Sequence, residues 1–209
     1  MTRVKICGIT TLDDAMFATE AGADSLGFNF AVEAKPKGRY VSPDAAQRII
    51  EQLPPFVTAT AVCVNEPADK LAEYLEFVDW VQLHGEESID VCKRVGTRAI
   101  KAFRIGAGFE PQTALEYPVA AFLVDACVPG ARGGTGVTCD WNLARGMAAL
   151  GRPLILAGGL TPGNVAEAIR KVRPYAVDTA GGVESTPGKK DHGKIRAFIQ
   201  NAKHALAVS

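Results

Sequence analysis

The chain has 209 residues, of which 47% are hydrophobic and 22% are charged, so it can bury a large core and does not have the composition of a disordered protein. Lysine plus arginine equal aspartate plus glutamate at 23 each, which excludes a general basic field for holding nucleic acid. An anion-binding site must therefore come from individually placed groups.

Cysteine and histidine usage argues against disulfides and metal sites. The five cysteines (7, 63, 92, 127 and 139) are odd in number and form no C-x-x-C pair, which is typical of a reducing compartment. The three histidines form no H-x-x-x-H pair, so we expect no metal site. No apolar signal segment follows Met1, and no run approaches the about 20 apolar residues of a membrane helix. We expect a soluble, cytoplasmic protein that binds neither nucleic acid nor membrane.

The first half of the chain alternates between strand-like and helix-like segments. A short strand over 4–6 leads to Thr11-Leu12-Asp13-Asp14, which is a capped helix start. The strand over 24–30 is followed by a polar loop over 33–39 and then by Ser42-Pro43, an N-cap with proline at the first helical position. Later strands are predicted over 57–64, 80–83 and 99–103, with helices opening at 65–67 and spanning 86–95.

The second half continues the alternation. A weaker, proline-broken helical segment over 111–117 leads to a sixth strand over 119–125. A glycine-rich loop over 129–136 then reaches a helix that begins at Asp140-Trp141. The remaining elements are strands over 153–157 and 175–178, a helix capped at Thr161-Pro162 between them, and a last helix from about 189 to 207.

The pattern amounts to eight strands and eight helices, with no composition shift that would mark a linker. Alternating strands and helices predict a parallel sheet with right-handed crossovers, and eight units favour a closed barrel over an open sheet. We therefore predict an α/β protein, a single (β/α)₈ TIM barrel with parallel strands in one domain over 1–209.

Two residues with acid–base chemistry stand at the carboxyl ends of the predicted strands, where barrels of this kind place their active sites. Cys7 ends the first strand and Asp125 ends the sixth, so in a closed ring of eight they face each other across the mouth. A buried cysteine alone is usually inert packing, and an aspartate after a strand often only caps a turn. Together they suggest a general base and a general acid that flank a substrate.

Paired glycines follow the seventh and eighth strands at Gly158-Gly159 and Gly181-Gly182. Without a Cβ the backbone can turn its N–H groups closely toward an anion, and this barrel often binds phosphate after these two strands. Either pair alone would be read as a tight turn, but the two together favour phosphate binding.

Other polar residues lie near the predicted strand ends. The Gly133-Gly134-Thr135-Gly136 segment follows Asp125 directly and is a candidate substrate lid. For Gln82, His84 and Lys101 a structural hydrogen bond or ion pair is the expected role.

Seven motifs are spread in this order along the whole chain: KICGIT (5–10), GFNF (27–30), RYVS (39–42), QLHG (82–85), Asp125 with GGTG (133–136), LAGGL (156–160) and GVES (182–185). In this combination the chain resembles the phosphoribosylanthranilate isomerases of tryptophan biosynthesis. Two segments depart from the family's usual form. The segment over 31–38 is longer than the Lys-Ser-Pro-Arg form that is usual in the family, so Lys35 or Lys37 could share the role of Arg39. Ala180-Gly181-Gly182 stands where Ser-Ser-Gly is usual.

The resemblance implies an Amadori rearrangement of N-(5-phosphoribosyl)anthranilate to the 1-deoxyribulose 5-phosphate product, without cofactor or metal. It implies that Asp125 protonates the ring oxygen and that Cys7 removes the C2′ proton. Arg39 would contact the anthranilate carboxylate, and Gly158, Gly159, Gly181 and Gly182 would hold the phosphate.

Two other classes of protein are alternatives. One is another phosphosugar isomerase or epimerase barrel; a metal-dependent epimerase should show paired histidines at strand ends, and the histidine-pathway isomerases use aspartate where Cys7 stands. The other is a non-catalytic phosphate-ligand binder, which would need no acid–base pair. The expected partner is a small-molecule phosphosugar, with the protein a monomer or homodimer.

Overall fold

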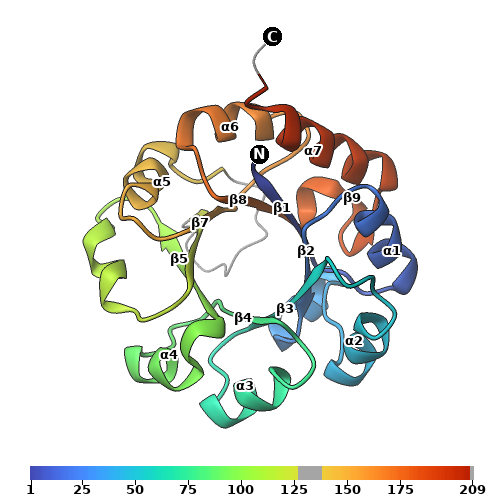
Figure 1. Cartoon of the computed structure of the whole chain (residues 1–209), viewed down its shortest axis with the longest axis horizontal. Helices are drawn as coiled ribbons and strands as arrows, with labels where there is room; N and C mark the ends of the chain where they lie inside the picture. The colour runs from blue at the N-terminus through green and yellow to red at the C-terminus, as the bar shows by residue number, and fades with distance from the viewer. Residues whose placement is uncertain (127–137, 208–209) are drawn as a thin grey trace.

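The central strands form one closed, all-parallel barrel in chain order, as the alternation predicted. The computed structural model describes residues 1–126 and 138–207. Figure 1 shows the strands in the centre and the helices around them. The barrel strands are β1 (Arg3–Cys7), β2 (Ser25–Asn29), β3 (Thr58–Cys63), β4 (Trp80–Leu83), β5 (Ala99–Ile105), β6 (Ala121–Ala126), β7 (Leu154–Leu156) and β8 (Ala176–Thr179).

Seven α-helices lie in the described part of the chain: α1 (Leu12–Glu20), α2 (Pro43–Ile50), α3 (Ala68–Tyr74), α4 (Ile89–Val95), α5 (Trp141–Ala148), α6 (Val165–Val172) and α7 (His192–His204). The prediction of an eighth α-helix is wrong at the fifth position, where η3 (Pro111–Glu116) is a 3₁₀ helix. Its N-cap, Glu110, makes no side-chain hydrogen bond, so nothing local favours a longer α-helix. The other 3₁₀ helices are η1 (Val32–Lys37), inside the predicted polar loop, η2 (Gly96–Arg98) and η4 (Gly181–Val183).

The last helix begins later than predicted because a small hairpin precedes it. Strands β9 (Glu184–Thr186) and β10 (Lys189–Lys190) pair antiparallel, and Gly188 turns between them with a φ of +79°. Asp191 then caps the helix, since its side chain accepts a hydrogen bond from the Lys194 N–H. The predicted start near 189 therefore falls within β10.

Alternation along the strands decides which side chains face the barrel interior. Val4 and Ile6 belong to the large apolar cluster shared by strands and helices, so Lys5 and Cys7 point the other way, into the barrel. A smaller apolar cluster, against which Trp80 packs, fills the interior: Ile100, Ala102, Ala121, Leu123, Ile155, Ala157 and Ala176. Along β6 the interior side chains change from Ala121 and Leu123 to Asp125, so polar groups collect at the carboxyl ends of the strands.

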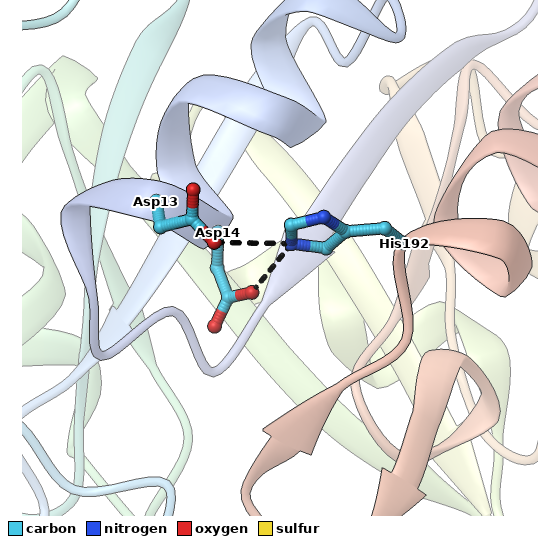
Figure 2. A group of neighbouring side chains, drawn as sticks. All are labelled: Asp13, Asp14 and His192. Atoms are coloured by element: carbon cyan, nitrogen blue, oxygen red, sulfur yellow. Dashed lines mark hydrogen bonds and ion pairs between the residues drawn. The ribbon is translucent and has the colours of Figure 1, made fainter.

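The first and last helices close the outer ring side by side, α1 in blue and α7 in red in Figure 1. Figure 2 shows the contact between their amino ends, where His192 points at Asp13 and Asp14. His192 Nε2 donates to Asp14 Oδ1 over 2.9 Å, and its ring stacks on Phe17 with centroids 3.9 Å apart. No helix in the described residues is both long enough and apolar enough to span a membrane.

We expect His192→Ala to lower the free energy of unfolding by about 1–2 kcal/mol, because it removes one hydrogen bond and one aromatic stack. Urea denaturation of the variant and the parent measures the difference. His204→Ala is the matched control, since that exposed ring bonds only to the Gln200 carbonyl within α7. Equal losses in the two variants would contradict the role given to the contact between α1 and α7.

Candidate active site

A cavity of about 560 Å³ opens at the carboxyl end of the barrel. It brings together three residues that the sequence singled out: Cys7 from β1, Arg39 from the loop after β2, and Asp125 from β6. Its remaining lining residues are Gly8, Asn29, Ala31, Glu33, Ala34, Pro36, Lys37, Val62, Val64, Gln82, His84, Asp178 and Ala180. Polar lining residues on the barrel strands come from β1, β2, β4, β6 and β8, so a bound molecule would meet polar groups from five strands.

The Cys7 thiol shares a small space with the ammonium of Lys5. A Cβ placed on Gly27 would lie 2.8 Å from Cys7 Sγ and 3.0 Å from Lys5 Nζ, so both atoms crowd over the bare α-carbon of Gly27. Lys5 Nζ donates to Asp178 Oδ1 over 3.0 Å, and this ion pair is buried. The absence of a side chain on Gly27 therefore makes room for a thiol beside a cation.

Burial raises the pKa of the Cys7 thiol above its ordinary value of 9.0. The positive charges of Lys5 and Lys190 and a hydrogen bond from Lys5 act in the opposite direction, while the Asp178 carboxylate adds to the rise. For Lys5 itself, burial lowers the pKa, but the charges of Asp178 and Cys7 outweigh burial and raise it, so the ammonium keeps its charge. The thiolate is thus formed at high pH and is stabilised chiefly by Lys5.

Asp125 lies on the other side of the cavity with its side chain 9% exposed. Its Oδ1 accepts a hydrogen bond from the Ala126 N–H over 2.8 Å, and its Oδ2 lies 3.7 Å from His84 Nε2. Gly158, which follows β7, lies against it, since a Cβ there would be 2.9 Å from Asp125 Oδ1. One oxygen is therefore fixed by the backbone, and the other faces the cavity.

Arg39 reaches the cavity through a buried cluster of charges. Its Nε and Nη2 donate to the two oxygens of Glu184 over 2.8 and 2.7 Å. Lys190 Nζ donates to Glu184 Oε1 over 3.0 Å and to the carbonyls of Cys7 and Ala180 over 2.7 and 3.1 Å. Two cations thus surround one carboxylate, and the cluster keeps an excess positive charge beside the cavity.

The cluster changes the ionisation of its members. Burial by itself would raise the pKa of Glu184, but the hydrogen bonds and charges of Arg39 and Lys190 outweigh burial and hold the pKa below 4.5. Burial lowers the pKa of Lys190, and the neighbouring Glu184 opposes this change. The Glu184 carboxylate is therefore ionised near neutral pH.

The four glycines predicted to bind phosphate are not among the residues that line the cavity, although Gly158 and Gly181 lie against the lining residues Asp125 and Arg39. Gly158 and Gly159 have φ values of +80° and +60°, which side chains rarely adopt. A Cβ on Gly181 would lie 2.7 Å from Arg39 Nη2, and one on Gly182 would lie 1.9 Å from the Leu160 carbonyl oxygen. Close backbone approach thus requires glycine at these positions. Gly181 and Gly182 also open η4, where first-turn N–H groups lack helical acceptors.

The structure separates the two lysines near Arg39. Lys37 lines the cavity, whereas the Lys35 ammonium lies over the Tyr40 ring, 4.7 Å from its centroid. The predicted lid over 133–136 lies outside the described residues. Lys101 forms the expected ion pair, with Glu87 at 2.7 Å.

Sequence reasoning missed Lys5, Asp178, Glu184 and Lys190. For Lys5 a signal was present, because it stands two residues before Cys7 on the same face of β1. Among the described residues, one group brings metal-ligating atoms within 4.8 Å of one another: Asp13, Asp14 and His192. This group shares no residue with the cavity and is the contact between α1 and α7 described above.

A closed (β/α)₈ barrel with ionisable groups gathered in a cavity at its carboxyl end defines a barrel enzyme. The family described as N-(5′-phosphoribosyl)anthranilate (PRA) isomerase matches residues 4–201. A relative of that name from Citrifermentans bemidjiense is 52% identical over 100% of both chains.

Two solved structures agree with this match. The phosphoribosyl anthranilate isomerase of Thermotoga maritima is 45% identical, with a TM-score of 0.88 over 97% of this chain and 99% of that one. Another phosphoribosyl anthranilate isomerase, 43% identical with a TM-score of 0.84 over 97% and 99%, is in complex with reduced 1-(o-carboxyphenylamino)-1-deoxyribulose 5-phosphate. The chain belongs to the N-(5′-phosphoribosyl)anthranilate isomerase family.

We expect Lys5→Met to raise the pKa of Cys7 further and to slow its alkylation by iodoacetamide about tenfold at a given pH, equivalent to one pKa unit. The double variant Lys5→Met/Asp178→Asn should slow the alkylation less, because it also removes the carboxylate that repels the thiolate. In the parent the rate should still rise with pH near 9, since burial raises the pKa of Cys7 above its ordinary value of 9.0 and most of the thiol is still protonated there.

The same measurement on Cys7→Ala gives the alkylation rate of the other cysteines, which is subtracted. Lys203→Met controls for the loss of a distant positive charge. An unchanged alkylation rate in Lys5→Met would show that Lys5 does not stabilise the thiolate.

Proposed function

We propose that this chain converts N-(5′-phosphoribosyl)anthranilate to 1-(2-carboxyphenylamino)-1-deoxyribulose 5-phosphate by general acid–base catalysis, with Asp125 as acid and Cys7 as base. The observation that carries the proposal is their placement in one cavity, on strands β6 and β1, in a member of this isomerase family. An acid and a base on separate strands can reach different atoms of one substrate without neutralising each other.

Substrate and product have the same atoms, because Asp125 gives one proton and Cys7 takes one; exchange with solvent then returns both residues to their starting states. Protonated Asp125 gives its proton to the furanose ring oxygen, the C1′–O bond breaks, and the nitrogen lone pair forms a C1′=N⁺ Schiff base. The Cys7 thiolate takes the C2′ proton, and the released electron pair forms the C1′=C2′ bond of an enolamine. Tautomerisation then moves the C2′ hydroxyl proton to C1′ and gives the ketone. No step requires a cofactor or metal.

The charged groups around the cavity suit the two ends of this substrate. The excess positive charge of the cluster of Arg39, Glu184 and Lys190 would attract the anthranilate carboxylate, and Lys37 adds a third cation to the cavity lining. The backbone N–H groups of Gly158, Gly159, Gly181 and Gly182 would hold the phosphate, as expected for glycines after strands seven and eight.

We place the protein in tryptophan biosynthesis, in the cytoplasm. Its partner is a small-molecule phosphosugar, and it acts as a monomer or homodimer. The acid, the base and the cation cluster all come from one chain.

Purified protein should consume phosphoribosylanthranilate, followed as loss of anthranilate-type fluorescence with the substrate generated enzymatically. Asp125→Asn and Cys7→Ala should each keep the fold and lower kcat by about 100-fold or more, because general acid–base catalysis contributes that much. Cys63→Ala is the control for loss of a buried thiol, since Cys63 does not line the cavity. No turnover by folded parent protein would overturn the proposal; full activity in either site variant would remove that residue from the mechanism.

Arg39→Met/Glu184→Gln should raise KM about tenfold or more and change kcat less, because the double variant removes the guanidinium without leaving an unpaired buried carboxylate. Lys35→Met is the matched control from the same loop and should leave KM unchanged. A KM shift of equal size in both variants would show that loop structure, and not the guanidinium, is responsible.

A further inference from the structure

Arg39 offers only part of its guanidinium to the cavity, because Glu184 holds the rest. The Nε and Nη2 atoms of Arg39 donate to the two carboxylate oxygens of Glu184 over 2.8 and 2.7 Å, which makes a two-point fork. The Glu184 side chain is 3% exposed and is not among the residues that line the cavity. Arg39 lines the cavity, so Glu184 meets a bound molecule through Arg39.

The fork decides which edge of the guanidinium is left for a ligand. A guanidinium carries five N–H donors in one plane, so a carboxylate that takes Nε and Nη2 leaves both N–H groups of Nη1 and one of Nη2. Among the described residues, no hydrogen bond or ion pair is made by Nη1 of Arg39. Two parallel donors on the terminal nitrogens match the oxygens of a second carboxylate. The free edge of Arg39 can therefore bind a carboxylate at two points.

Glu184 is itself firmly held. Lys190 Nζ donates to its Oε1 over 3.0 Å, and Lys194 Nζ donates to its backbone carbonyl over 2.7 Å. Glu184 begins β9, and the turn of that hairpin lies against the loop after β2, since a Cβ on Gly188 would be 2.5 Å from the Gly38 carbonyl oxygen. A carboxylate fixed in this way gives the guanidinium one orientation.

Two effects of Glu184 on anion binding have opposite signs. Its negative charge offsets one of the two neighbouring cations, so this charge weakens the attraction of the cavity for an anion. Its fork orients the guanidinium, so a bound carboxylate need not order a long, mobile side chain. The pairing of both oxygens with Nε and Nη2 favours orientation as the role, because compensation of charge alone needs no matched fork.

We propose that Glu184 is a positioning residue that makes the cavity select a ligand bearing a carboxylate, because it holds Arg39 with the free edge of the guanidinium available to that carboxylate. This inference rests on the proposed function, in which the anthranilate carboxylate meets Arg39. The favoured ligand carries a carboxylate ortho to its ring nitrogen substituent, and the disfavoured ligand has the same ring without it. A contact kept in the ground state and the transition state changes KM and leaves kcat nearly unaffected.

Three variants separate orientation from charge. Glu184→Gln keeps the size of the side chain but leaves one acceptor oxygen for donors of both Arg39 and Lys190, so the fork is lost. Glu184→Asp keeps the charge but is shorter by one methylene. Glu87→Gln is the matched control, because Glu87 is another buried carboxylate in an ion pair, 2.7 Å from Lys101 Nζ, and does not line the cavity.

The probes are phosphoribosylanthranilate for turnover and two ligands for calorimetric binding. One is reduced 1-(o-carboxyphenylamino)-1-deoxyribulose 5-phosphate, and the other is its counterpart that lacks the carboxyl group. The ratio of their dissociation constants measures the preference for the carboxylate, which a general loss of stability would not change.

We expect Glu184→Gln to raise KM about tenfold with kcat within about threefold, and to weaken the carboxylate ligand about tenfold but the carboxyl-free ligand hardly at all. Glu184→Asp should weaken the carboxylate ligand about threefold, because its shorter side chain loses part of the fork. Glu87→Gln should leave the ratio between the two ligands unchanged. If Glu184→Gln does not fold, Glu184→Asp decides, since a role through charge alone predicts parent values for it.

Tighter binding of the carboxylate ligand by Glu184→Gln would overturn the proposal, because that is the result expected from charge alone. Unchanged binding, equal weakening of both ligands, or a parent protein without preference for the carboxylate ligand would overturn it as well. Absence of turnover in the parent would instead refute the proposed function, and the calorimetric ratio would still decide the role of Glu184, so the two failures are distinct.

Discussion

The structure around the cavity depends on one buried ammonium, that of Lys190. It donates to the carbonyl of Cys7 at the end of the first strand, to the carbonyl of Ala180 after the last strand, and to the carboxylate of Glu184. Because Glu184 also receives the forked hydrogen bonds of Arg39, the same cation sets the place of that side chain. Backbone carbonyls and a carboxylate this deeply buried would be costly without a donor, so Lys190 links the end of β1 to the segment after β8 and contributes to the shape of the site.

Burial and the neighbouring positive charges act in opposite directions on the pKa of Cys7, the proposed base. Burial raises the pKa of Cys7 and so disfavours the thiolate that the proposed base requires. Lys5 beside it favours the thiolate, and Asp178 balances the charge of Lys5. The bare backbone of Gly27 makes this arrangement possible, because any larger residue would push the sulfur and the ammonium apart.

Parallel strands explain why these groups meet. Each strand sends alternate side chains into the barrel, where an apolar layer ends and polar groups begin at the carboxyl side. The cavity is thus built largely on the strand ends of a closed barrel, and the buried ion pair of Lys101 and Glu87 links β5 to the turn after β4. Groups held in this way can present donors and acceptors to a substrate without rearrangement.

The sequence by itself determined the eight strands, the closed barrel, and the presence of Cys7, Asp125 and Arg39 around one cavity. It could do so because hydrophobic periodicity and strand ends are local features. It failed at η3 and at the start of α7, where a proline-broken segment and a two-residue strand give weak periodic signals.

Only the tertiary structure decided which charges pair. Lys5 meets Asp178 across 173 positions of sequence, Arg39 meets Glu184 across 145, and Lys190 meets the Cys7 carbonyl across 183. No local pattern encodes such contacts, because they exist only once the first and last strands close the ring. The residues that tune the site therefore follow from barrel closure, whereas the residues at its strand ends follow from the order of the chain.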